Sequence, residues 1–192
     1  MSPRNKTQNE AIRNSSIEKI INAAIPLFSK QGYESTSISQ IAKSAGVSKG
    51  LIYNYFESKH ELLKGVFDYF GSREEDIMSD VVDENPRIFL RNIFQLTFKE
   101  LKERPEFWKM VMGMSIQPDM YSFIHEMALE KMNKYFPLFE KLLKGCGIDH
   151  PHQEAKLVAA QLDGIVIHYL LAKEGYPLDE VEKYLIEKYC TE

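Results

Sequence analysis

Polar, basic and aromatic residues cluster near residue 50, at a spacing that would suit contact with DNA. Lys49, Gly50, Tyr53 and Asn54 would share the outward face of one short helix, with Tyr55 nearby. An Asn amide can pair with base edges, Lys can bind phosphate or guanine, and Tyr can contact phosphates and thymine methyl groups. This face therefore has the composition of a recognition helix.

The residues around that face have the spacing of a helix-turn-helix over 37–56. Ala42 is small enough for two helices to cross closely, and Gly46 can take the left-handed conformation that ends the first helix. Ser48 can cap the next helix and leave its first amides directed outward, toward a phosphate. The inside of the corner would be buried by Ile38, Ile41, Ala45, Val47 and Ile52. The alternative is a compact helical corner with no DNA partner.

Charge is distributed unevenly along the 192 residues. The first 59 residues hold eight Lys and Arg against four acids, a net charge of +4, and the whole chain has −4, so the remainder has −8. A basic head on an acidic body suits a protein that sets one end against phosphates. Such segregation can also arise by chance.

Helical periodicity runs through nearly every segment after residue 15, and no segment alternates as a half-buried strand does, so we expect an all-α fold. The first helix should open at a capping box formed by Ser15 and Glu18 and end at Gly32. Pro26 lies inside it and predicts a kink or a local loss of hydrogen bonding.

Two more capping pairs, Ser37 with Gln40 and Ser58 with Glu61, predict the starts of the second helix and of a long fourth helix. The third helix should run from Ser48 to about Phe56. Prolines divide the rest of the chain into five or six helices. Their expected spans are 86–103, 106–115, 119–144 with a kink at Pro137, 152–174 and 178–190.

The sequence also bears on location and redox state. No apolar run approaches the about 20 residues that a membrane-spanning helix needs, and the polar start offers no signal peptide, so we expect a cytoplasmic protein with no membrane partner. Cys146 and Cys190 are too few and too far apart for a disulfide framework and are interpreted as ordinary thiols.

The head also resembles a known family. The residues that match are Ala23-Ala24, Leu27-Phe28, Gly32-Tyr33, Thr36-Ser37-Ile38, Ile41-Ala42, Ala45-Gly46-Val47-Ser48, Gly50, Ile52-Tyr53, Tyr55-Phe56, Lys59 and Leu62-Leu63. Over residues 14–74 this pattern is similar to the signature of the tetracycline-repressor (TetR) family. Pro26 is a departure that the family pattern does not require.

The resemblance implies an Ω-shaped, all-helical homodimer of about nine helices. It implies a DNA-binding domain at 14–74 and a ligand-binding and dimerisation domain at 75–192, and the polar composition of residues 1–13 predicts an N-terminal arm before them. The resemblance implies that Lys59 contacts a phosphate. Ser48 and Asn54 are predicted to face DNA from the helix-turn-helix pattern described above. The other residues that the resemblance brings to DNA are Thr36, Ser37, Lys49, Gly50, Leu51, Tyr53 and Tyr55.

A Met-rich and aromatic stretch at 107–127 is a candidate ligand pocket, because thioethers and rings can line an adaptable apolar cavity. Ordinary core packing is the competing interpretation for each residue. The candidate pocket residues are Trp108, Met112, Gln117, Tyr121 and His125.

A second stretch, at 159–171, is apolar around most of a helix, and Gly164 would let a partner backbone come close. It resembles the penultimate helix of the family, which pairs with the last helix and their symmetry mates as a four-helix dimer bundle. Packing within one chain is the alternative. The candidate dimer residues are Gly164, Ile167, Leu171, Val181 and Leu185, while Asp163 and His168 are interpreted as structural polar groups.

Cys146, His150 and His152 have types that bind metals, but Gly145, Gly147 and Pro151 favour an exposed loop, so we expect no metal. No cofactor is expected.

The leading hypothesis is a DNA-binding repressor that a small, largely apolar effector releases from a two-fold symmetric operator. An enzyme is not expected, because nucleophile-elbow, phosphate-loop and metalloprotease motifs are missing. The alternative is a helical small-molecule-binding protein or an adaptor without DNA binding.

Overall fold

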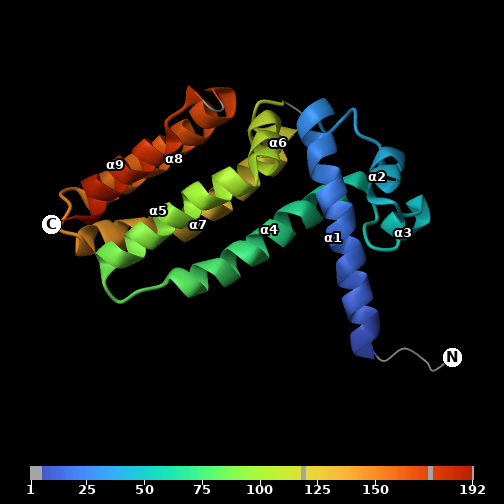
Figure 1. Ribbon diagram of the computed structural model, residues 1–192, viewed down its shortest axis with the longest axis horizontal. Coiled ribbons are helices and arrows are strands. Elements are labelled where there is room, and N and C mark those ends of the chain that lie inside the picture. Colours follow the sequence, from blue (N-terminus) through green and yellow to red (C-terminus); the bar gives the residue numbers. More distant parts are fainter. Residues whose placement is uncertain (1–5, 118–119, 173–174, 192) are drawn as a thin grey trace. The chain divides into compact units, whose positions relative to one another are not determined.

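A computed structural model describes residues 6–117, 120–172 and 175–191, without the side chains of residues 6, 7, 73–77 and 121. Within these ranges the chain forms nine α-helices and no strand (Figure 1), which confirms the all-α prediction. It divides into two compact units, Met1–Glu74 and Glu75–Glu192, and we call them the head and the body.

The first helix of the head, α1 (Lys6–Gln31), starts earlier than predicted. Ser15 lies inside it rather than at its start, and the neighbouring Ser16 hydroxyl donates to the Ile12 carbonyl at 2.8 Å. No Gly or Pro separates residues 6 and 15, so nothing stops the helix from extending outward, and much of the predicted polar arm is helical. The helix continues through Pro26 and ends before Gly32, whose φ is 82°.

Three more helices complete the head: α2 (Ile38–Ala45), α3 (Lys49–Tyr53) and the larger part of α4 (Lys59–Val81). The helix α4 begins with a cap at Ser58, whose hydroxyl accepts from the Glu61 amide at 3.0 Å. These helices pack around one apolar centre. Its buried members include Ile20, Ile21, Ala24, Phe28, Ile41, Ile52, Leu62, Leu63 and Val66.

The body is a bundle in which α5 packs against both α7 and α9, while α8 packs against α7 and α6. Proline stands at the first position of α5, α6 and α8, where its missing amide proton costs no hydrogen bond. The bounds are α5 (Pro86–Glu103), α6 (Pro105–Ser115), α7 (Tyr121–Gly145), α8 (Pro151–Ala172) and α9 (Leu178–Cys190).

Long-range bonds close this bundle at one end. The Arg87 guanidinium donates to the carbonyls of Cys146 at 2.8 Å and Thr191 at 2.5 Å, and Arg91 donates to the Cys190 carbonyl at 3.3 Å. Two arginines of α5 thereby bind the carboxyl ends of α7 and α9, where helix carbonyls lack partners of their own. Both cysteines are free thiols buried in the core.

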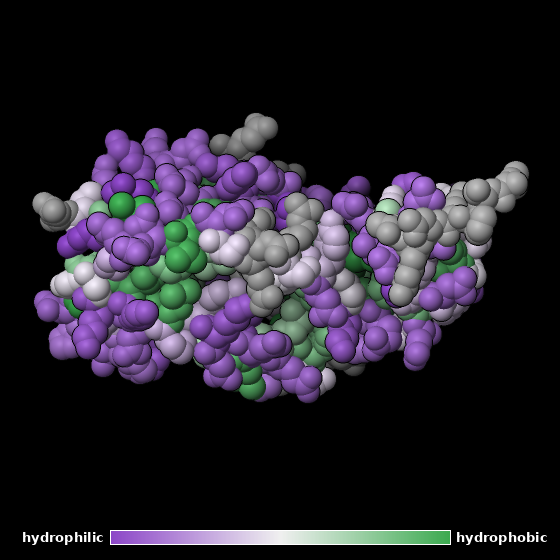
Figure 2. All heavy atoms as spheres, turned by 90° about the horizontal axis from the view of Figure 1, so that it is seen from below, coloured by the Kyte–Doolittle hydropathy of each residue, from purple (hydrophilic) through white to green (hydrophobic). Residues whose placement is uncertain are grey.

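The helix α8 corrects the expectation that no segment approaches the length and apolar composition of a membrane-spanning helix. Pro151–Ala172 is long and apolar enough to cross a membrane by length and composition alone, a test that core helices also meet. Its apolar residues divide between two faces, with Val158 and Ile165 buried while Leu157 and Leu171 are 55% and 77% exposed. The face of the molecule drawn in Figure 2 is mostly hydrophilic, with hydrophobic patches between.

Candidate nucleic-acid interface

The corner of the head is built by a left-handed glycine. Gly46 has φ 66° and ψ 31°, and its amide and that of Val47 both reach back to the Ala42 carbonyl of the preceding turn. This conformation is costly for most residues with a Cβ atom, so the turn favours glycine. The structure confirms the predicted end of the second helix and sends the chain directly into α3.

Side-chain caps fix the starts of α2 and α3. Ser37 and Gln40 form a complete capping box: the Ser37 hydroxyl accepts from the Gln40 amide at 3.2 Å, and the Gln40 side chain accepts from the Ser37 amide at 2.8 Å. The Ser48 hydroxyl accepts from the Leu51 amide at 3.1 Å. Both caps agree with the sequence-based prediction and leave both helix starts exposed.

The outward face of α3 carries the expected polar and aromatic groups. Lys49, Gly50, Tyr53 and Asn54 are exposed, and Tyr53 keeps 46% of its surface open. The Lys49 ammonium lies 5.9 Å from the Tyr53 ring centroid, so the two side chains share one patch. Leu51 and Tyr55 are half-buried at its edges.

Helix α3 is shorter than predicted because the chain turns inward after Tyr53. Phe56 is only 9% exposed, and its ring packs where Gly65 leaves room on α4. A Cβ atom on Gly65 would lie 2.5 Å from the Phe56 ring.

Thr36 does not belong to the exposed face, which corrects one predicted DNA contact. It is 1% exposed, its hydroxyl donates to the Gly32 carbonyl at 2.7 Å, and it accepts from the Gln31 amide group at 3.1 Å. Because this buried hydroxyl both donates and accepts a hydrogen bond within the protein, Thr36 stabilises the turn between α1 and α2.

Lys59 has a structural role that the sequence did not reveal. Its ammonium donates to the carbonyls of Tyr33 at 2.9 Å and Glu34 at 3.2 Å and lies 4.2 Å from the Tyr33 ring centroid. Burial, and then the Glu34 carboxylate, raise the pKa of the Tyr33 hydroxyl. Lys59 also lies 3.7 Å from the Glu34 carboxylate, so it ties the start of α4 to the loop before α2 through two carbonyls and an ion pair.

Sequence reasoning missed one residue at this surface, Arg13 of α1. Its guanidinium carbon lies 5.9 Å from the Tyr55 ring centroid. The continuous run of helix-compatible residues from Lys6 onward could have revealed it.

The candidate pocket residues of the body do not converge on a described hollow. Trp108 and Met112 are half-buried and pack against the core, and Gln117 is also half-buried. His125 is exposed on α7, and the Tyr121 side chain lies outside the described residues. An open hollow of about 570 Å³ lies nearby, lined in part by Lys102, Lys109, Tyr169, Tyr176 and Leu178.

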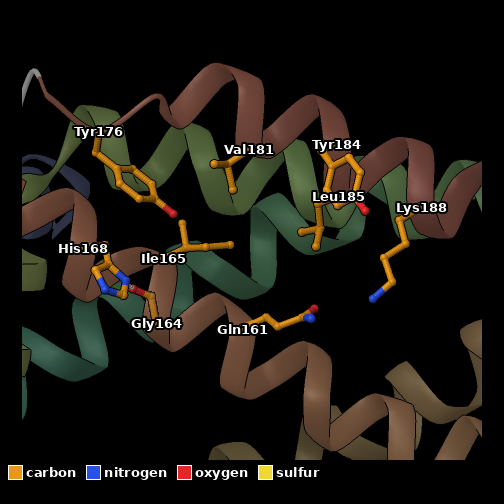
Figure 3. Close-up of a pocket in the computed structure, with 9 residues that line it drawn as sticks. All are labelled: Gln161, Gly164, Ile165, His168, Tyr176, Val181, Tyr184, Leu185 and Lys188. Atoms are coloured by element: carbon orange, nitrogen blue, oxygen red, sulfur yellow. Dashed lines mark hydrogen bonds between the residues drawn. The ribbon is translucent and has the colours of Figure 1, made fainter.

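The candidate dimer residues lie on α8 and α9, and three of the five line a second hollow of about 330 Å³ (Figure 3). Gly164, Val181 and Leu185 line it, while Ile167 and Leu171 are 44% and 77% exposed. His168, as expected, is hydrogen-bonded: its Nδ1 lies 2.8 Å from the Gly164 carbonyl, and its ring stacks on Tyr176. The three residues considered for a metal do not share a site, because Cys146 is buried while His152 pairs with Glu140 at 2.9 Å.

A capped helical corner with a basic and aromatic face defines the class of helix-turn-helix proteins. Residues 20–66 match the family model described as bacterial regulatory proteins, tetR family. This part of the head therefore forms a tetR-family domain.

Individual relatives agree with this assignment. AcrR of Shigella flexneri, an HTH-type transcriptional regulator, is 27% identical, over 96% of this chain and 93% of that protein. YerO of Bacillus subtilis, an uncharacterized HTH-type transcriptional regulator, is 29% identical over 53% of this chain, which spans only 37% of that protein. The solved structure of FadR from Bacillus subtilis, a complex with stearoyl-CoA, has a TM-score of 0.73 at 20% identity and covers 91% of this chain and 97% of that one. These relatives are named as regulators, in agreement with the expectation that the chain is not an enzyme.

Proposed function

We propose that this protein is a homodimeric transcriptional regulator that acts in the cytoplasm and places α3 in the major groove of a two-fold symmetric operator. The observation that carries the proposal is the exposed face of Lys49, Gly50, Tyr53 and Asn54 on a helix fixed by a cap and a left-handed turn. Asn54, Tyr53 and Lys49 offer groups for base edges and phosphates.

Gly50 supports the proposal because nothing within the protein requires it. Its φ is not in the left-handed region, and a Cβ atom there would meet only the Ser48 hydroxyl, at 3.9 Å. Glycine in a helix costs about 0.5 to 1 kcal/mol relative to alanine, so an external reason is expected. The close approach of a DNA backbone would supply that reason.

The Gly50→Ala variant tests this explanation, because stability and operator affinity should change in opposite directions. We expect the variant to raise the free energy of unfolding by about 0.5 to 1 kcal/mol while weakening operator binding. The operator is first obtained by selecting the preferred duplex from random DNA with the wild-type protein. Failure to enrich any duplex, or an affinity that does not fall steeply with salt, would overturn the DNA-binding proposal.

For the dimer we propose the face formed by α8 and α9. Leu157, Ile167, Leu171 and Tyr184 are exposed hydrophobic residues of these two helices, at 55%, 44%, 77% and 68%. A second copy would remove this apolar area from water, and a two-fold interface would bring the same face from each chain together. Two recognition helices could then reach half-sites about 34 to 36 Å apart.

Leu171→Glu tests the dimer face against the matched variant Val82→Glu. Both residues are exposed hydrophobics of the body, at 77% and 62%, but Val82 lies outside α8 and α9. Sedimentation velocity should show a monomer for Leu171→Glu and a dimer for Val82→Glu. A dimer in both variants would remove this face from the proposal.

We further propose repression with release by a small, largely apolar effector that enters the body near 107–127. Lys109, which lines the hollow of about 570 Å³, directly follows Trp108 in the sequence. Because FadR of Bacillus subtilis was solved in complex with stearoyl-CoA, an acyl-CoA is the first molecule to test. An effector releases DNA only if it binds the two states of the protein differently. Bound acyl-CoA that leaves operator affinity unchanged at fixed salt would contradict acyl-CoA as the effector.

A further inference from the structure

The amino-terminal part of α1 extends beyond the core of the head. The helix begins at Lys6, whereas its first fully buried residue is Ile20, and residues 8–15 are exposed all round. The head therefore carries a helical projection whose side chains are largely open to solvent over about two turns. In Figure 1 this segment is the dark-blue end of α1.

One face of the projection continues the face that packs into the head. Ile20 is buried and Ile17 half-buried, and Arg13 follows one turn further toward the amino terminus, on the same side of the helix. Arg13 is thus the first exposed residue of this stripe, beside the corner that contains α3.

Tyr55 fixes where Arg13 lies. The guanidinium carbon stands 5.9 Å from the Tyr55 ring centroid, within the range of a cation–π contact. Tyr55 lies two residues after the end of α3, and its side chain is half-buried. A contact with a ring uses none of the guanidinium N–H groups, so they remain able to donate.

Arg13 is exposed, and neither Glu10, one turn before it, nor Glu18 lies within ion-pair distance of its guanidinium. Among the described residues no carboxylate forms an ion pair with it, and Glu18, the acid one turn and a half further on, accepts instead from the Tyr69 hydroxyl at 2.9 Å. A planar guanidinium with open donors next to a recognition helix fits a phosphate, which it can bind through two parallel hydrogen bonds.

We propose that Arg13 binds a DNA phosphate next to the bases that α3 reads, with Tyr55 as the residue that positions it. This inference rests on the proposed function and adds α1 to the DNA-contacting surface. A phosphate contact carries no sequence information, so Arg13 should strengthen binding to every duplex alike.

The test compares Arg13→Gln with Lys19→Gln in the full chain. Lys19 is an exposed cation of the same helix, six residues along and on another face. Operator affinity is measured by fluorescence anisotropy from 0.05 to 0.5 M salt. For Arg13→Gln we expect the slope of log affinity against log salt to fall by about 0.9 per phosphate contact, which corresponds to about an eightfold weaker affinity at 0.1 M salt.

Three further readings separate the possible explanations. Arg13→Lys should restore most of the slope, an unchanged unfolding midpoint in Arg13→Gln would show that the fold is intact, and a scrambled duplex should lose the same factor as the operator. Equal slopes for Arg13→Gln, Lys19→Gln and the wild type would overturn the inference. A wild type without salt-dependent DNA binding would instead overturn the proposed function itself.

Discussion

The corner of the head and the body bundle are held in different ways. In the corner, the helix ends are fixed by side chains three positions away, such as Ser37 with Gln40 and Ser48 with Leu51. In the body, Arg87 and Arg91 reach residues 104 and 99 positions away to bind helix ends. Local caps therefore fix the starts of the corner helices, whereas the ends of the bundle helices are bound by distant elements.

The largest effect should come from opening the body core. Phe94 is fully buried on α5 and packs 6.1 Å from the Tyr189 ring, so Phe94→Ala should lower the free energy of unfolding by about 3 to 5 kcal/mol. Denaturant unfolding measures this. The exposed Val82→Ala should change stability by at most about 0.5 kcal/mol, and equal effects of both would contradict the assigned core.

Alkaline pH should destabilise the body. Burial, and then the nearby Cys146, raise the pKa of the Cys190 thiol to about 11, from 9.0. Because the folded pKa is the higher one, the contribution is complete below pH 9 and is lost as the pH rises from 9 through 11. A shift of about two pKa units corresponds to a loss of about 3 kcal/mol. Denaturant unfolding between pH 8 and 11 should show that the free energy of unfolding declines as the pH rises, and Cys190→Ala should make this decline shallower. An equally steep decline in the variant would contradict the role of Cys190.

A change at the corner turn should act mainly on the head. Gly46→Val places a β-branched residue in the left-handed conformation and should cost about 2 kcal/mol, although an added Cβ atom would have no neighbouring atom within 4 Å. Gly46→Asn is the matched variant, because asparagine tolerates this conformation. Thermal unfolding and operator binding of the two variants should therefore differ. Equal stability would show that the backbone conformation is not what the glycine provides.

The smallest effect concerns a single cap. Ser37→Ala removes the hydroxyl that accepts from the Gln40 amide and should lower stability by about 1 kcal/mol. Ser39→Ala, two residues further on the exposed side of α2, serves as the control. If chemical denaturation finds the same stability for both variants, the capping box contributes nothing.

The difference between local caps and distant contacts also explains which features could be predicted from the sequence. The caps at Ser37, Ser48 and Ser58 and the turn at Gly46 follow from neighbouring residues, and each was predicted. The start of α1 was not, because a plausible capping box at Ser15 lay within a run that remains helical.

Roles that depend on distant contacts were beyond local reasoning. Lys59 has the sequence context of a phosphate contact, yet it binds carbonyls 25 and 26 residues away. Thr36 stands beside an exposed cap but is buried by its own turn. In the body, composition alone identified a Met-rich segment but could not show which of its residues border a hollow.

The central claim is that the exposed face of α3 reads DNA, and Tyr53→Ala tests it most directly. Binding of this variant and of the wild type is measured on the selected operator and on a scrambled duplex at one salt concentration. The account predicts that Tyr53→Ala loses about 1 to 3 kcal/mol of binding free energy on the operator, keeps its affinity for the scrambled duplex and retains the wild-type unfolding midpoint. Unchanged operator affinity in a folded variant would contradict it.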